Sequence, residues 1–90
     1  MIKGQTKSGF KFSVNPNILN DWDFLETIEA LNTGDTSLAT VKKALVILLN
    51  ESGFDRLKNH IKTRNNGITD VNMMVAEIAE IMEALNIKNS

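Results

Sequence analysis

The sequence predicts an α+β domain that is mainly α-helical, in which an N-terminal β-hairpin is followed by about four helices. Three observations lead to this prediction. Apolar and polar residues alternate near the N-terminus, apolar residues recur with helical spacing from residue 18 onward, and 42% of the 90 residues are apolar. Because this length and composition suit one hydrophobic core, we expect a small single domain over residues 1–90.

Residues 1–15 are predicted to form the hairpin. Phe10, Phe12 and Val14 occupy alternate positions, which is the period of a strand with one buried face. Gly9 can supply the positive φ angle that a tight turn needs. Since the two aromatic rings share the face opposite the lysines, we expect them in the core and not on a stacking platform for nucleic acid.

The helical region, residues 17–85, begins with a helix that we expect to start between Asn17 and Asn20 and to end before Gly34. Its apolar side chains cover an arc of about 180°, which indicates contact with two neighbours. These residues are Ile18, Trp22, Phe24, Leu25, Ile28 and Leu31. Trp22, the single tryptophan, is predicted to anchor the core between this helix, the hairpin and another helix. The alternative is that it lies in a partner-binding groove.

Two further helices are predicted over 38–50 and 53–64. Thr36 or Ser37 caps the first of them. Its second half is apolar on nearly every side, so this helix is expected in the middle of the domain. The next helix is shorter and is expected to begin at Gly53.

A fourth helix, 71–85, has the clearest amphipathic pattern and an expected N-cap at Asp70. Glu77, Glu80 and Glu83 are assigned to its solvent-facing side, and residues 86–90 are expected to be a tail. The residues predicted to be buried across the helical region are Trp22, Leu25, Ile28, Leu45, Leu48, Leu49, Ile78 and Met82.

The composition argues against an enzyme and against a metal site. The chain has no cysteine and one histidine, His60, whereas a structural metal site takes about four ligands. His60 is expected to pack, partly exposed, at the edge of its helix. No glycine-rich phosphate loop and no convincing Ser-His-Asp set is visible. We therefore expect no catalytic, cofactor-binding or metal-binding residues, and no cofactor.

Charge and hydropathy restrict the partners. Residues 1–14 carry only basic charges and residues 21–35 only acidic ones, so no single large positive footprint for nucleic acid arises. The longest apolar run, 44–49, is far too short to span a bilayer, and the N-terminus lacks the apolar run of a signal peptide. We expect a cytosolic protein that binds neither membranes nor nucleic acid.

Three segments resemble those of the tail assembly chaperones of long-tailed (siphovirus-type) bacteriophages. They are KSGFKF at 7–12, DWDFLE at 21–26 and LLNESGFDRL at 48–57. The order of the elements is also similar over nearly the whole chain. The region around Lys58, His60 and Arg64 matches least well.

The resemblance implies a non-enzymatic assembly factor in the cytoplasm of the infected bacterium, absent from the mature virion. Members of this family bind the tape measure protein, a long and largely helical chain, and keep it soluble until the tail tube protein polymerises around it. We therefore expect the tape measure protein as partner, with the major tail tube protein, a frameshifted longer form of this chain and further copies of the chain itself as additional ones. The alternative is a small phage regulatory or inhibitory protein that binds a host protein or nucleic acid.

Two residues are predicted to contact the client, Phe24 and Met73. Phe24 belongs to an apolar arc wider than one contact needs, and Met73 lies off the apolar stripe of its helix, where a flexible side chain suits varied surfaces. We expect both on the surface between the first and fourth helices, in an apolar groove that holds a client helix.

The resemblance also implies a longer form of the protein, made by a −1 ribosomal frameshift near the end of the reading frame. The slippery heptamer A-AAA-AAC encodes Lys-Asn, which the chain has at Lys88-Asn89, and an ATA codon for Ile87 would supply the leading A. Because the apolar stripe ends at Leu85, an extension would leave the fold intact. Sequencing codons 87–89 tests this prediction: we expect the heptamer followed by an open −1 frame, and its absence would contradict the longer form.

Overall fold

A computed structural model describes residues 1–86; the expected site at Lys88-Asn89 lies outside the described residues. The described part contains an N-terminal hairpin, a short 3-10 helix and three α-helices, which are β1 (Ile2–Gln5), β2 (Lys11–Val14), η1 (Pro16–Asn20), α1 (Trp22–Asn32), α2 (Leu38–Arg64) and α3 (Val71–Ala84). The predicted class is confirmed, but there are three α-helices in this part of the chain and not about four.

The hairpin pairs β1 with β2 in antiparallel register, with Gly4 opposite Phe12. Gly9 has a φ of +93° in the connecting turn, as predicted. Phe10, Phe12 and Val14 are buried, which confirms that this face of β2 belongs to the core. The ring of Phe12 lies over Gly4 so closely that an added Cβ would stand 2.5 Å from Phe12 Cζ. A side chain at Gly4 would therefore force the buried ring of Phe12 to shift.

The predicted first helix is divided into η1 and α1. Asp21 separates them because its backbone is extended, with φ −79° and ψ 126°. Its carboxylate accepts a hydrogen bond from the backbone N–H of Phe24 at 2.9 Å and so caps α1. At the other end Gly34 has a φ of +99°, in keeping with its predicted place just beyond the helix.

The predicted second and third helices are the two halves of α2. The break between them is a single residue, Asn50, whose φ of 61° and ψ of 177° are not helical. Its side-chain oxygen accepts hydrogen bonds from the N–H of Gly53 and the hydroxyl of Ser52, each at 3.0 Å. Asn50 therefore acts as an internal cap, which lets the helix change direction and resume at once.

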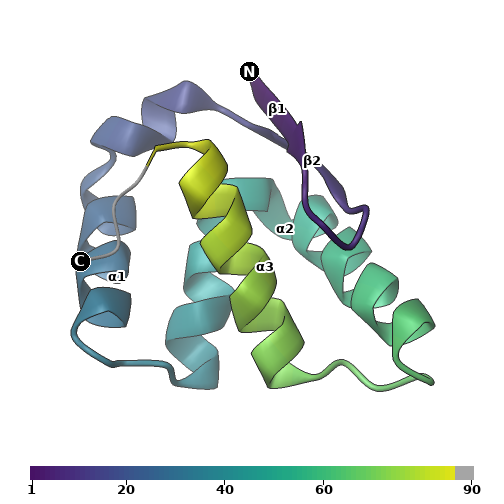
Figure 1. Ribbon diagram of the computed structural model, residues 1–90. Helices are drawn as coiled ribbons and strands as arrows, with labels where there is room; N and C mark the ends of the chain where they lie inside the picture. Colours follow the sequence, from purple (N-terminus) through teal and green to yellow (C-terminus); the bar gives the residue numbers. More distant parts are fainter. Residues whose placement is uncertain (87–90) are drawn as a thin grey trace.

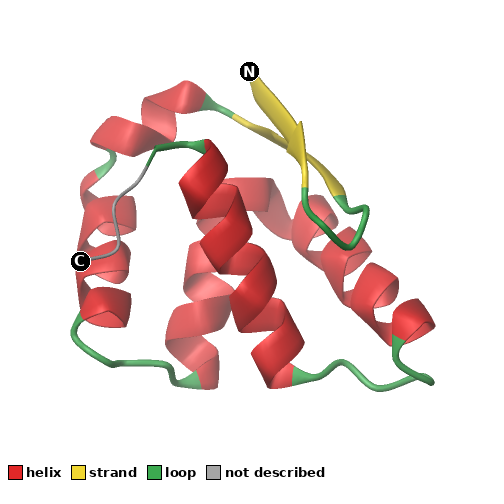
Figure 2. Ribbon diagram, in the orientation of Figure 1, coloured by secondary structure: helices red, strands yellow, loops and turns green. Residues whose placement is uncertain are grey.

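The other α-helices and the hairpin pack on the two halves of α2 (Figures 1 and 2). α1 packs against α2 and lies beside its first half, α3 packs against α2, and β2 packs against α2 where the hairpin covers the second half. Asp70 caps α3 as predicted, its carboxylate accepting from the N–H of Met73 at 3.0 Å. Ser37 is the N-cap of α2.

Most of the predicted core is confirmed. Buried side chains form one cluster that includes Ile28, Leu45, Leu48, Leu49, Ile78 and Met82. Trp22 and Leu25 were predicted to be buried, and this is wrong: they are 76% and 49% exposed. The hairpin lies on the second half of α2 and not on α1, so α1 does not receive the second neighbour that its wide apolar arc suggests. The opposite side of that arc faces solvent.

Candidate functional site

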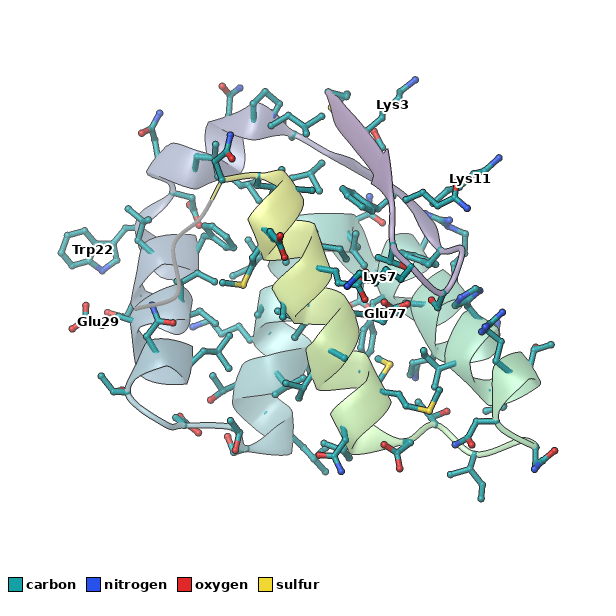
Figure 3. All side chains as sticks on the ribbon, viewed as in Figure 1. Lys3, Lys7, Lys11, Trp22, Glu29 and Glu77 are labelled. Atoms are coloured by element: carbon teal, nitrogen blue, oxygen red, sulfur yellow. The ribbon has the colours of Figure 1, made fainter. Side chains whose placement is uncertain are left out.

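A polar cluster joins the hairpin turn to α2 and α3. The hydroxyl of Ser8 lies 2.9 Å from Nε2 of His60 and donates a hydrogen bond to the carboxylate of Glu77. The hydroxyl of Thr6 donates to the same carboxylate at 3.1 Å. Glu77 is only 3% exposed, so the prediction that it faces solvent is wrong. In Figure 3 its side chain lies beneath the turn, beside Lys7.

Serine, histidine and glutamate together raise the question of nucleophilic catalysis. In a catalytic triad the histidine takes the serine proton, and the carboxylate binds the other ring nitrogen of that histidine. Here the carboxylate of Glu77 accepts directly from the hydroxyls of Ser8 and Thr6. The half-buried ring of His60 packs on Phe10, with 5.6 Å between ring centroids. This geometry differs from that of a triad and holds the hairpin in place.

A groove opens between α1 and α3, the two helices between which the client surface was predicted. Its volume is about 300 Å³. The lining is mostly aliphatic, with two polar residues at one end, and consists of Leu31, Asn32, Thr36, Val41, Val75, Ile78, Ala79 and Met82. We call it the α1–α3 groove. In the sequence, only the pair Val75 and Ala79, four residues apart on α3, could have indicated this groove. That spacing is equally typical of a helix packed in a core.

The loop at the polar end of the groove is held by Asp35. Its carboxylate accepts hydrogen bonds from the hydroxyl of Thr40 at 2.8 Å and from the N–H of Ser37 at 3.1 Å. These bonds, that of Thr40 foremost, hold the pKa of the Asp35 carboxyl below its ordinary value. The loop that carries Thr36 is thereby fixed to the start of α2.

The two residues predicted to contact a client do not line this groove. Phe24 is 1% exposed and belongs to the core, so its assumed place on the surface is wrong. It fills the space under α1 that Trp22 was expected to fill. Met73 is half-buried and packs against the core. Its role in partner binding stays a prediction, whereas Phe24 cannot touch a partner that binds the surface of this conformation.

The outer side of α1 carries a second apolar surface. Trp22, Leu25, Glu26 and Glu29 surround a shallow hollow of about 180 Å³. Because two apolar side chains stand here beside two carboxylates, we call these four residues the acidic face. The indole N–H of Trp22 donates to the carboxylate of Glu26 at 3.3 Å. Figure 3 shows Trp22 and Glu29 projecting from α1 on the side away from Lys3 and Lys11 of the hairpin.

Other kinds of site have little support within residues 1–86. No group of three or more histidine, aspartate or glutamate side chains could hold a metal ion there. No helix in that range is both long and apolar enough to cross a bilayer. Comparisons with protein-family models, with curated proteins and with solved structures find no match to the chain.

The polar cluster yields a stability prediction. Thr6→Val keeps the shape of the side chain but removes a donor to the buried carboxylate of Glu77 and the acceptor of the Phe10 N–H. Hydrogen bonds to charged groups contribute about 1.5–3 kcal/mol, so we expect the free energy of unfolding to fall by about that amount in urea titrations. The exposed Thr63→Val is the matched control and should change it by less than about 0.5 kcal/mol. Equal effects of the two substitutions would contradict a structural role for the cluster.

Proposed function

We propose that this chain is a non-enzymatic phage tail assembly chaperone that binds the helical tape measure protein and keeps it soluble in the host cytoplasm. The observation that carries the proposal is the α1–α3 groove, an open aliphatic surface between two helices. The resemblance of residues 7–12, 21–26 and 48–57 to this chaperone family supplies the identity of the client. The tail tube protein, which later replaces the chaperone around the client, is the second partner that this function implies.

The groove suits an amphipathic helix. Such a helix inserts side chains spaced three or four residues apart into an apolar groove. Val41, Ile78 and Met82 are buried at the groove, while Leu31 and Val75 are half-buried and remain partly accessible. A volume of about 300 Å³ is at the lower end of ligand-sized pockets, enough for a few inserted side chains but not for a folded domain. One copy would therefore cover a short piece of a long client.

The second candidate is a regulatory protein that binds nucleic acid, favoured by one feature. Lys11, Arg56 and Arg64 line an open hollow of about 520 Å³ beside the hairpin. Single-stranded nucleic acid binds where positive charge and exposed aromatic rings occur together. Here the ring of Phe10 is 4% exposed and the guanidinium of Arg56 already lies 5.3 Å from its centroid. Because the Phe10 ring is not available to stack on a base, this hollow supports nucleic-acid binding less than the α1–α3 groove supports a chaperone.

The function is tested by co-expression with the long helical protein expected from the gene immediately downstream. Wild-type chain should raise the fraction of that client found in the supernatant of the lysate and should retain the client in a pull-down. Ala79→Arg places a long charged side chain in the α1–α3 groove from an exposed position and should remove the effect. Ala76→Arg, on the same helix but outside the groove lining, is the matched control and should retain it.

Three outcomes separate the claims. If wild-type chain leaves the client insoluble and unbound, the chaperone function is wrong. If both arginine variants keep the client soluble, the function stands but the groove is not the contact. If both variants lose activity, the stability of Ala76→Arg is measured by thermal unfolding. An Ala76→Arg variant as stable as wild type would then count against the groove, because an arginine outside the groove would be as harmful as one inside it. Phe24→Ser is unsuitable for this test because it opens the core.

A further inference from the structure

Within residues 1–86, five of the six large apolar side chains that are exposed fall in two groups, one beside acidic residues and the other near lysines. Trp22 and Leu25 stand on the acidic face of α1. Leu38, Ile68 and Val71 are 69%, 62% and 44% exposed near the start of α2 and the start of α3. Scattered apolar side chains are normal at a surface, but two gathered groups of this size call for an explanation.

The acidic face has no basic neighbour in the sequence around it. Residues 12–41 contain no lysine, arginine or histidine, and residues 21–35 carry five acidic groups. Glu26 and Glu29 rise beside Trp22 and Leu25 around the same shallow hollow. A partner for this face must therefore offer apolar surface flanked by positive charge.

The second group provides that combination. Leu38 and Val71 stand at the edge of a hollow of about 120 Å³ whose floor includes the buried Leu45, Phe54 and Met74. Lys42 and Lys58 complete the edge, with their ammonium groups 5.9 Å and 4.9 Å from the centroid of the Phe54 ring. We call this the lysine-rimmed hollow.

Acidic residues also lie near this rim. Asp70 directly precedes the lining residue Val71, and its carboxylate is engaged as the N-cap of α3, accepting from the N–H of Met73 at 3.0 Å. Asp55 is 3.9 Å from the ammonium of Lys58, and the side chains of Lys58 and Asp55 are 43% and 65% exposed. Exposed pairs at that distance contribute little, so Lys58 can exchange Asp55 for another carboxylate at small cost. The rim therefore remains available to an acidic partner.

We propose that the acidic face of one copy docks on the lysine-rimmed hollow of a second copy. Trp22 and Leu25 cover Leu38 and Val71, while Glu26 and Glu29 pair with Lys42 and Lys58. Burial of the indole supplies most of the affinity, and the charges set orientation and partner choice. Because the two surfaces consist of different residues, each copy has one of each to offer. This association needs no client and does not depend on the proposed function.

Charge exchange tests the pairing. The face variant carries Glu26→Lys and Glu29→Lys, and the hollow variant carries Lys42→Glu and Lys58→Glu. Sedimentation analysis over a concentration series should show wild type associating, and more weakly as salt is raised. Each variant alone should remain monomeric, because like charges then meet. An equimolar mixture should associate again, because reversed face meets reversed hollow and the two original surfaces meet each other.

Controls and opposing outcomes follow from the same series. Lys43→Glu combined with Glu83→Lys changes exposed charges outside both surfaces and should associate like wild type. Trp22→Ala should weaken association by about 30-fold, the loss typical of an interface hot spot. A wild-type chain that stays monomeric, a Trp22→Ala variant that associates normally, or a mixture that fails to associate would each overturn the proposal. If a monomeric chain instead binds its client through Trp22, the acidic face belongs to the client.

Discussion

The carboxylate of Glu77 is buried where the hairpin turn meets α3, and the position of the hairpin depends on it. A charged group taken out of water is costly unless donors surround it, and here the donors are the hydroxyls of Thr6 and Ser8. Both belong to the hairpin, about seventy residues away in the chain. The turn can satisfy Glu77 only when the hairpin lies over the second half of α2 with Phe10 and Phe12 in the core.

This placement of the hairpin determines which surfaces remain open. The hairpin closes the core on one side, and α1 closes it on the other with Phe24 and Ile28. With the hairpin at the far side, the outer side of α1 has no neighbour within residues 1–86, and Trp22 faces solvent. The kink at Asn50 contributes as well, because it directs the second half of α2 toward the hairpin and brings Phe54 beside Leu45 at the lysine-rimmed hollow. Lys3 and Lys11 of the hairpin and Glu29 of α1 thus lie on opposite sides of the molecule (Figure 3).

The sequence predicted what short-range chemistry controls. The cap at Asp70, the turn at Gly9 and the buried face of β2 all depend on residues a few positions apart, and all are confirmed. Of the two caps predicted for the start of α2, Thr36 or Ser37, the structure uses Ser37. Helical periodicity also identified most of the core. The errors arose where distant partners decide: Glu77 looks solvent-facing unless the hydroxyls of the turn are known to reach it. Trp22 and Phe24 share one wide apolar arc, and only the tertiary neighbours determine which of them is buried. The single-residue break at Asn50 is too short for a sequence pattern to distinguish from a loop.

The emission of Trp22 tests most directly whether α1 presents an open face. Because the chain has one tryptophan, its fluorescence reports on that face alone. At a concentration where sedimentation shows a monomer, the emission should be that of an indole in water and should shift little when urea unfolds the protein. On association it should move to shorter wavelength as the indole leaves water. Short-wavelength emission in the dilute folded monomer, lost on unfolding, would mean that Trp22 is a core residue and would contradict an open face on α1.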